Sequence, residues 1–283
     1  MSEEKVNKLN RLLQTVPDGF LVEASTLAYN GYKESLRNKY VERGWLTRPA
    51  RGVYQKVSSG LGREEMTWQW VVFSLQTGLA ALPNPKIENR RVLVSGLTAL
   101  ELQGMGHYVP LGGRNEVHLS SYSTLPGWVY KLPIKQNFIC HKLGRLFDEK
   151  DLERHYPKLY GSHVRDWSGD PERSLTTNPP ELAILELLEL IPRDQDFDAV
   201  DAIFEGLTEL RPKLTSDLLL ICKSVKVKRL FFWFARRHNH AWLKHLDEGK
   251  VDLGSGKRAI VKGGKLDKRY SITVPEHLHD ADT

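Results

Sequence analysis

Arginine and asparagine side chains can read bases in a DNA duplex, and both occur in the stretch 31–54, GYKESLRNKYVERGWLTRPARGVY. Arginine pairs with guanine, and asparagine with adenine, through two hydrogen bonds each. Arg37 and Asn38 are neighbours in a short run with helical spacing, which Gly44 ends. These residue types predict recognition of nucleic acid.

The sequence around this run predicts the elements that would position it. Residues 45–57, WLTRPARGVYQKV, are typical of a tight hairpin with two arginines. Residues 23–29 are typical of a preceding helix, and Gly31 suits a tight turn because glycine adopts positive φ without strain. A helix, a turn, a second helix and a basic hairpin together predict a winged helix-turn-helix, whose second helix enters the major groove.

The period of the second helix divides its side chains between two faces. Tyr32, Leu36 and Tyr40 recur every fourth residue, so we expect them to face the core. We expect Arg37 and Asn38 to point away and contact bases, and the other cations to contact phosphates. The predicted DNA-binding side chains are Lys33, Ser35, Arg37, Asn38, Arg43, Arg48 and Arg51. The alternative is a small helical domain with a solvated basic face.

Composition sets the broad class of the protein. The chain has 283 residues and a net charge of +6, which allows two or three domains and is compatible with a nucleic-acid partner. Cys140 and Cys222 lie in no metal-type spacing and are expected to be reduced in a cytoplasmic protein. The charged N-terminus has no signal-peptide pattern, and the apolar runs are too short to span a bilayer.

We predict an α+β fold with three regions. A winged helix-turn-helix occupies 1–57, an α+β region 63–165, and a mainly helical, basic region ending in a β-hairpin 178–283. Residues 58–62 and 166–180 have linker composition. In the middle region we expect helices at 63–79 and 96–102, and strands at 92–95, 116–120, 128–132 and 138–141.

The C-terminal region is expected to contain helices at 181–190, 197–210, 214–222 and 227–238, then a hairpin whose arms are 258–264 and 269–274. Asn178 is expected to cap the first of these helices, with Pro179 at its first position. The acidic residues of this helix, Glu181, Glu186 and Glu189, are expected to face water.

Positive charge accumulates late in the chain. Residues 223–269 contain fourteen Lys or Arg and four Asp or Glu, interleaved with aromatics such as Phe231 and Phe234, which we expect to be core. A local excess of this size favours an anionic partner. The side chains assigned to this basic surface are Lys226, Lys228, Arg229, Arg236, Arg237, Lys244, Lys257 and Arg258.

Candidate catalytic and metal sites are weak by comparison. His238, His240 and His245 follow Cys222, but no metal-binding motif frames them. Residues 253–258, LGSGKR, lack the strand and helix of a phosphate-binding loop, so a basic turn is expected. We predict no cofactor and no metal.

An enzyme active site is also not indicated. In the middle region, Glu101, Glu116 and Lys131 are the only set that could form a metal-dependent nuclease site, and their spacing is not diagnostic. Cys140 and His141 would point to opposite faces of a strand. The protein is therefore expected not to be an enzyme.

Several segments resemble AbiEi-type antitoxins of bacterial type IV toxin–antitoxin systems. They are LLQTVPDGFLVEASTLAYNGYKESLRNKYVERGWLTRPARGVYQ, SGLTALELQGMGHYVPLGG, VHLSSYSTLPGWVYKL and SVKVKRLFFWFARRHNHAWLKHLDEGKVDLGSGKRAIVKGGKLDKRYSITVP. The resemblance implies a winged helix that binds inverted repeats in double-stranded DNA upstream of its own operon. It also implies that the rest of the chain counteracts a nucleotidyltransferase-like toxin without a stable complex.

Two other functions remain open from the sequence. A metal-dependent nucleic-acid-processing enzyme could use the winged helix for targeting. A scaffold protein could instead use the basic C-terminal region to dock on an acidic protein.

Overall fold

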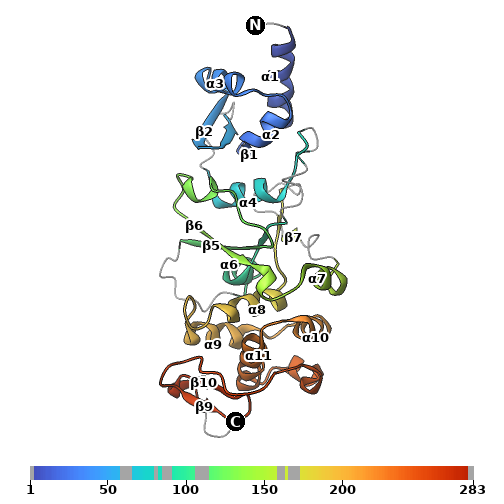
Figure 1. Ribbon diagram of the computed structural model, residues 1–283, viewed down its shortest axis with the longest axis vertical. Helices are drawn as coiled ribbons and strands as arrows, with labels where there is room; N and C mark the ends of the chain where they lie inside the picture. The colour runs from blue at the N-terminus through green and yellow to red at the C-terminus, as the bar shows by residue number, and fades with distance from the viewer. Residues whose placement is uncertain are drawn as a thin grey trace.

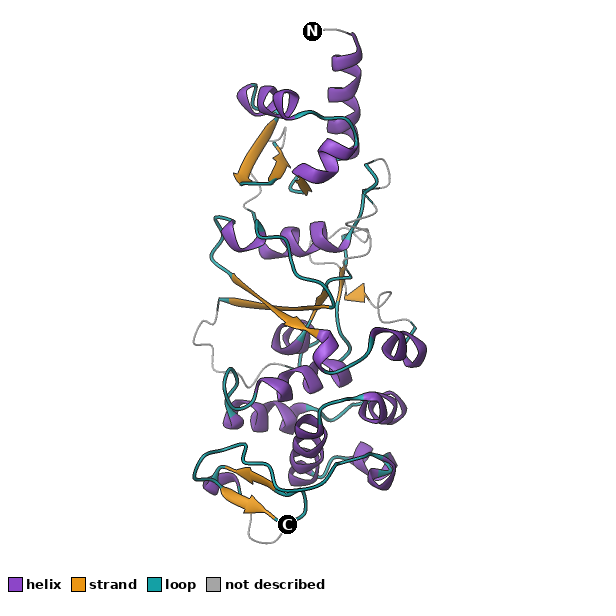
Figure 2. Cartoon of the chain, in the orientation of Figure 1, coloured by secondary structure: helices purple, strands orange, loops and turns teal. Residues whose placement is uncertain are grey.

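The computed structural model describes residues 3–57, 66–79, 82–84, 91–105, 115–157, 163–164 and 173–279. Its elements follow one another along one long axis, with the N-terminal unit at one end and the C-terminal hairpin at the other (Figure 1). Helices and small sheets alternate through the chain (Figure 2), which confirms the predicted α+β class.

The N-terminal unit contains the elements of a winged helix-turn-helix. Its helices are α1 (Glu3–Thr15), α2 (Ala24–Tyr29) and α3 (Glu34–Glu42). Strands β1 (Leu21–Glu23), β2 (Leu46–Ala50) and β3 (Val53–Lys56) form an antiparallel sheet in the order β1-β3-β2. The predicted hairpin is confirmed, and β1 adds a third strand to it.

Glycine makes the turn of the motif possible. Gly31 has a φ of +81°, and the amide of Tyr32 donates to the carbonyl of Leu27 across the turn. Tyr32 and Tyr40 are buried, as their spacing predicts. The sharp turn therefore fixes α3 against α2.

The middle of the chain is built around a second three-stranded sheet. Strand β5 (Glu116–Ser121) lies between β4 (Leu93–Val94), to which it is antiparallel, and β6 (Asn137–Lys142), to which it is parallel. Helices α4 (Trp68–Gln76), α6 (Gly96–Leu102) and α7 (Glu149–His155) accompany this sheet, with the 3-10 turns η1 (Val129–Lys131) and η2 (Leu143–Arg145). A short pair, β7 (His163–Val164) and β8 (Leu175–Thr176), follows.

The prediction of a strand at 128–132 is wrong. The amides of Val129 and Lys131 donate to carbonyls three residues earlier, Pro126 and Trp128, which closes a 3-10 turn. Trp128 and Val129 are buried and Tyr130 is exposed, so the segment lies against the core through one short turn whose amides are satisfied locally.

The second predicted linker is also wrong where the chain is described. Leu175 and Thr177 are buried, Thr177 bridges to Val94, and the amide of Asn178 donates to the carbonyl of Val94. This segment therefore pairs with the central sheet at Val94 and leads directly into helix α8. The first half of that linker and the linker 58–62 lie outside the described residues.

Helices dominate the C-terminal part: α8 (Pro180–Leu190), α9 (Phe197–Gly206), α10 (Pro212–Ile221) and α11 (Val225–His238). The cap of α8 lies one residue later than predicted, because Pro179 is the N-cap and Asn178 bonds inside the protein. Three 3-10 turns follow at η4 (Ala241–His245), η5 (Glu248–Lys250) and η6 (Glu276–Leu278). The final hairpin pairs β9 (Lys265–Asp267) with β10 (Ile272–Val274), so its first arm is later than predicted.

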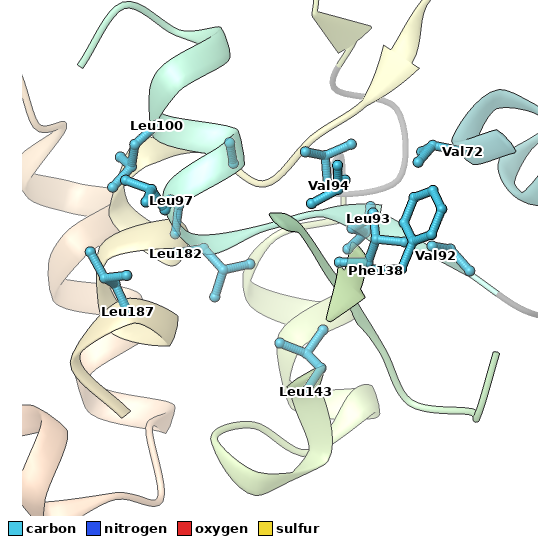
Figure 3. Close-up of a cluster of buried hydrophobic side chains, with 14 of the residues drawn as sticks. Val72, Val92, Leu93, Val94, Leu97, Leu100, Phe138, Leu143, Leu182 and Leu187 are labelled. Carbon is cyan, nitrogen blue, oxygen red and sulfur yellow. The ribbon is translucent and has the colours of Figure 1, made fainter. Parts of the chain in front are cut away.

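Part of the hydrophobic core lies between the central sheet and α6 and α8. Figure 3 shows side chains of Leu93, Val94, Leu97, Leu100 and Leu182 converging there. The predicted solvated acidic face of α8 is wrong, because Glu181 and Glu186 are buried and only Glu189 is half-buried. In the described part of the chain, no helix is both long and apolar enough to cross a membrane.

Hydrogen bonds attach the N-terminal unit to the middle of the chain. The amide of Leu21 donates to Ser74 Oγ at 2.9 Å, and Asn84 Nδ2 donates to Thr26 Oγ1 at 3.1 Å. Asn30 Nδ2 donates to the carbonyl of Pro83 at 3.0 Å. These contacts fix the orientation of the unit on α4 and the segment 82–84.

Candidate nucleic-acid interface

Helix α3 presents a polar face to solvent. Ser35 and Asn38 are one turn apart and both exposed, and Lys33 lies exposed at the N-cap. The predicted outward orientation of Asn38 is confirmed. Hydroxyl and amide groups on such a face can donate to and accept from base edges.

Arg37 does not share that face. Its side chain is only 8% exposed, and its Nη1 donates to the carbonyl of Ala24 at 2.6 Å. Its guanidinium carbon lies 5.4 Å from the centre of the Tyr54 ring. The prediction that Arg37 points away from the core is wrong, because α3 packs against both α2 and the wing and Arg37 fills the space between them.

The wing carries two exposed arginines beside α3. Arg48 lies on β2 with its guanidinium carbon 5.8 Å from the centre of the Tyr54 ring, and Arg51 lies in the turn of the hairpin. Gly52, with a φ of +98°, allows this turn. Arg43 is exposed after α3 and lies over Trp45, at 5.4 Å from its ring centre. Tyr54 and Trp45 thus hold cations at the edge of α3.

Lys39 is an exposed side chain that the sequence-based assignment omitted. It lies four residues after Ser35 and next to Asn38. Helical periodicity from Ser35 was the signal that could have placed it. With Arg37 removed and Lys39 added, the solvent face comprises Lys33, Ser35, Asn38, Lys39, Arg43, Arg48 and Arg51.

The basic C-terminal cations divide into two sets, and those of α11 are bound inside the protein. Lys228 and Arg229 are buried. Arg236 pairs with Glu248, and Arg237 with Asp201 at 3.0 Å. Lys226 Nζ donates to the carbonyls of Glu189 and Ile191. The prediction that these five form an open surface is wrong, because Lys228 is buried and the other four bond to acids or carbonyls distant in the chain.

The second set lies beyond α11 and is exposed. It contains Lys244, Lys257 and Arg258 of the predicted surface, together with Lys262, Lys265 and Lys268. No ion pair within the described residues involves any of these six side chains. We name Lys257, Arg258, Lys262, Lys265 and Lys268 the hairpin cations, since they lie in and around β9 and β10 at the C-terminal end (Figure 1).

The glycine-containing turn 253–258 is organised around an internal arginine. Arg229 Nε donates to the carbonyl of Leu253, and its Nη1 donates to the carbonyl of Gly256, both at 2.7 Å. Carbonyls, and not amides, therefore face this cation. The turn is a basic turn and differs from a phosphate-binding loop, in which amides face the ligand.

The other candidate sites are occupied by structural bonds or dispersed. His238 Nε2 lies 2.7 Å from Asp201 Oδ1, and His240 Nε2 lies 2.6 Å from the carbonyl of Phe204. Glu101 lies in α6, Glu116 begins β5 and Lys131 ends η1. Among the described residues, no three His, Cys, Asp or Glu side chains are placed to hold a metal ion.

Comparisons with known proteins agree with this architecture. The crystal structure of the RV2827C protein from Mycobacterium tuberculosis is similar over 96% of this chain and 91% of that chain, with a TM-score of 0.56 and 12% identity. At that identity the likeness concerns the fold. A search of curated proteins gives no match.

Two family profiles match consecutive parts of the chain. Residues 5–111 match the AbiEi antitoxin N-terminal domain of transcriptional regulators. Residues 114–275 match the transcriptional regulators described as AbiEi antitoxins of type IV toxin–antitoxin systems. The protein therefore belongs to the AbiEi antitoxin family of transcriptional regulators from type IV toxin–antitoxin systems.

Proposed function

We propose that the protein is a DNA-binding antitoxin that represses its own toxin–antitoxin operon through residues 1–57. It acts in the cytoplasm as a binding protein and not as an enzyme. The observation that carries this proposal is the solvent face of α3, where Asn38 and Lys39 lie open beside the wing cations Arg48 and Arg51. Asn38 is the candidate for base contact, and the cations are candidates for phosphate contact.

We call the winged helix-turn-helix of residues 1–57 the head. The head is proposed to bind inverted repeats, with one copy of the chain at each half-site. Lys33 lies at the N-terminus of α3 and Arg43 at its other end, so both can reach phosphates that flank the groove. Ser35 lies between them on the exposed face. Arg37 is left out of this contact set, because its guanidinium is held by Ala24 and Tyr54.

Operator binding tests the head. Asn38→Ala should weaken binding to the operator by about 1–3 kcal/mol while leaving non-specific binding nearly unchanged. A double Arg48→Ala, Arg51→Ala variant should weaken binding to all duplexes and lower the slope of log K against log salt by about 0.9 per lost contact. Lys150→Ala is the control, because Lys150 is exposed on α7.

Mobility shifts at several salt concentrations give both quantities. Unchanged operator affinity and salt slope in both the Asn38 variant and the wing double variant would reject the assignment of this face. A loss of equal size in Lys150→Ala would also reject it, because the effect would then follow net charge alone.

We further propose that residues 178–283 counteract a nucleotidyltransferase-like toxin without a stable complex. The hairpin cations and Lys244 support this proposal, because their charge has no partner within the described chain and a concentrated charge favours an anionic partner. The middle region, residues 63–165, is proposed to connect the two activities.

The two activities should be separable by mutation. A Lys257→Ala, Arg258→Ala, Lys262→Ala variant should lose rescue of growth from the co-expressed toxin and keep operator binding. The wing double variant should show the opposite pattern. Full rescue by the triple variant at equal protein level would exclude this surface from the antitoxic function.

A further inference from the structure

Arg229 of α11 is a buried arginine without a carboxylate partner. Its side chain is 3% exposed, and no ion pair within the described residues involves it. Its Nε donates to the carbonyl of Leu253, and its Nη1 donates to the carbonyls of Gly256 and Ser271. Nη2 bonds to no described residue, yet it is not sealed from solvent. Only carbonyl dipoles therefore meet this charge, and one nitrogen remains available to a ligand.

Arg258 brings a second guanidinium group to the same place. Its backbone amide donates to the carbonyl of Ser271 at 2.8 Å, and Arg229 Nη1 reaches that same carbonyl at 3.3 Å. The Arg258 side chain is exposed. Burial and the positive charge of Arg258 both lower the pKa of Arg229, so the two guanidinium groups are close enough to repel each other. Like charges held together in this way favour an anion between them.

The acids nearest in the sequence are bonded to other groups. Asp252 and Asp267 each accept from a backbone amide of their own turn, and Glu248 pairs with two other arginines. Within the described chain, none of the three forms an ion pair with Arg229 or Arg258. A buried charge that lacks a partner is costly. A ligand would therefore supply the negative charge that this site lacks.

The surroundings favour a phosphate group over the carboxylate of an acidic protein. A tetrahedral phosphate can accept from two guanidinium groups at once, whereas a single guanidinium fork already occupies a carboxylate. Protein partners also need large apolar anchors. The exposed large apolar side chains of the described chain, Tyr29, Tyr130 and Leu220, all precede α11. The same observation argues against stacking of bases on the hairpin, so contact would be with phosphates.

We propose that Arg229 Nη2 and Arg258 together bind a phosphate group of a nucleotide, while the other hairpin cations attract the rest of the anion. The nucleotide is either free or part of a nucleic-acid chain, since both carry the same phosphate chemistry. The carbonyls of Leu253 and Gly256 hold Arg229 in place, so guanidinium groups, and not backbone amides, contact the ligand. This inference rests on the proposed antitoxic function and names the chemical class of its anionic partner.

Calorimetry of the full-length protein at low salt tests the site, with sodium pyrophosphate and ATP as probes. We expect saturable binding that Arg258→Ala weakens by about tenfold, because charge-assisted hydrogen bonds are lost. Arg258→Lys should recover only part of the affinity, since an ammonium group lacks the planar fork. Arg154→Ala, exposed on α7, is the matched control and should change the affinity by less than about twofold.

Nucleic-acid probes separate the two sources of phosphate. The Arg48→Ala, Arg51→Ala variant is the background for this measurement, because it weakens binding by the head. Fluorescence anisotropy would follow a labelled single-stranded RNA and a labelled DNA duplex without the operator. Tighter binding of either chain than of ATP, weakened by adding Arg258→Ala, supports a nucleic-acid partner. Binding of ATP that is tighter than binding of either chain supports a free nucleotide.

NMR follows Arg229 directly, because replacing this residue would break three bonds to carbonyls. Its Nε–H signal should shift when the wild-type protein is saturated with pyrophosphate or with the chain that binds. An unchanged signal would overturn the proposal, and so would binding that Arg258→Ala does not weaken. Absence of saturable binding by any probe up to about 10 mM would also overturn it. Growth rescue is measured separately, so a failure here is distinguishable from a failure of the antitoxic function.

Discussion

The guanidinium carbon of Arg37 lies 5.4 Å from the centre of the Tyr54 ring, which ties helix α3 to wing strand β3. The same guanidinium donates to the carbonyl of Ala24 at the start of α2. One side chain thus joins three elements of the head. An arginine in this helix acts as an internal clamp, and this changes what its mutation should do.

We predict that Arg37→Ala destabilises the head. Loss of a buried, charge-assisted hydrogen bond and of a cation–π contact should lower the free energy of unfolding by about 1–3 kcal/mol. Thermal and urea unfolding of the full chain would measure this loss. Lys39→Ala is the control, because Lys39 is exposed on the same helix and its truncation should weaken DNA binding while leaving stability within about 0.5 kcal/mol. The reverse pattern would return Arg37 to the DNA-contact set.

Gly19→Ala should destabilise the contact between the head and α4. A Cβ atom at Gly19 would lie 2.6 Å from Trp70 Cε2, and Gly19 has a φ of +82°. Overpacking and backbone strain together should lower stability by about 3 kcal/mol. Gly44→Ala has similar backbone strain, with a φ of +72°, but no atom within 4 Å of the new Cβ. Its loss should be smaller, near 1 kcal/mol, and equal losses in the two variants would contradict the steric part of this prediction.

Arg211 supports a buried carboxylate at the start of α8. Its Nε and Nη2 donate to the two oxygens of Glu181, both at 2.9 Å, and the Glu181 side chain is 1% exposed. Arg211→Ala should lower stability by about 2–3 kcal/mol, because an ionised group loses two donors in a buried position. Lys213→Ala removes an exposed ion pair with Asp217 and should have almost no effect. Chemical denaturation of both variants makes the comparison, and a negligible loss in Arg211→Ala would show that water replaces the guanidinium.

Stability should depend on pH through Glu186. Burial raises the pKa of Glu186 to about 7 from 4.5, so the folded state binds a proton more tightly than the unfolded state. The contribution of Glu186 to the free energy of unfolding is therefore fully present below pH 4.5 and is lost as pH rises towards 7. His141 acts in the opposite direction between pH 4 and 6.5, because burial and the nearby His118 lower its pKa to about 4. The wild-type curve combines the two effects.

The difference between Glu186→Gln and the wild type isolates the carboxyl group. The stability of the variant relative to the wild type should increase by up to about 3 kcal/mol between pH 4.5 and pH 8. Urea unfolding at several pH values gives this difference. A difference that does not change with pH would mean that Glu186 titrates at the same pH in the folded and unfolded states.

The sequence predicts local elements well where glycine and helical period act together. The turn at Gly31, helix 96–102 and the wing hairpin follow from residue types within a few positions. The orientation of Arg37 could not be predicted, because α3 packs on two sides and its spacing indicates only the face of Tyr32 and Tyr40. The helical periodicity of apolar residues identifies one buried face of a helix and gives no information about a second buried face.

The buried acids and cations escaped prediction for a related reason. The Glu186 carboxyl accepts hydrogen bonds from Gly96 and Ser120, which lie far away in the chain. The Arg229 guanidinium donates to the equally distant carbonyls of Leu253 and Ser271. In the sequence, a charged residue on a helix that bonds to distant carbonyls or amides is indistinguishable from one that faces water. Long-range pairing therefore decides which charges remain available to a partner.

The bonds from Ser74, Pro83 and Asn84 to the head fix helix α3, together with the rest of the head, to the remainder of a long molecule. The hairpin cations lie at the opposite end of its long axis (Figure 1). A duplex held by α3 would thus leave that far end projecting from the promoter, free to meet a separate anion. We expect one molecule to bind operator DNA through the head and an anionic partner through the hairpin cations at the same time, without competition between the two.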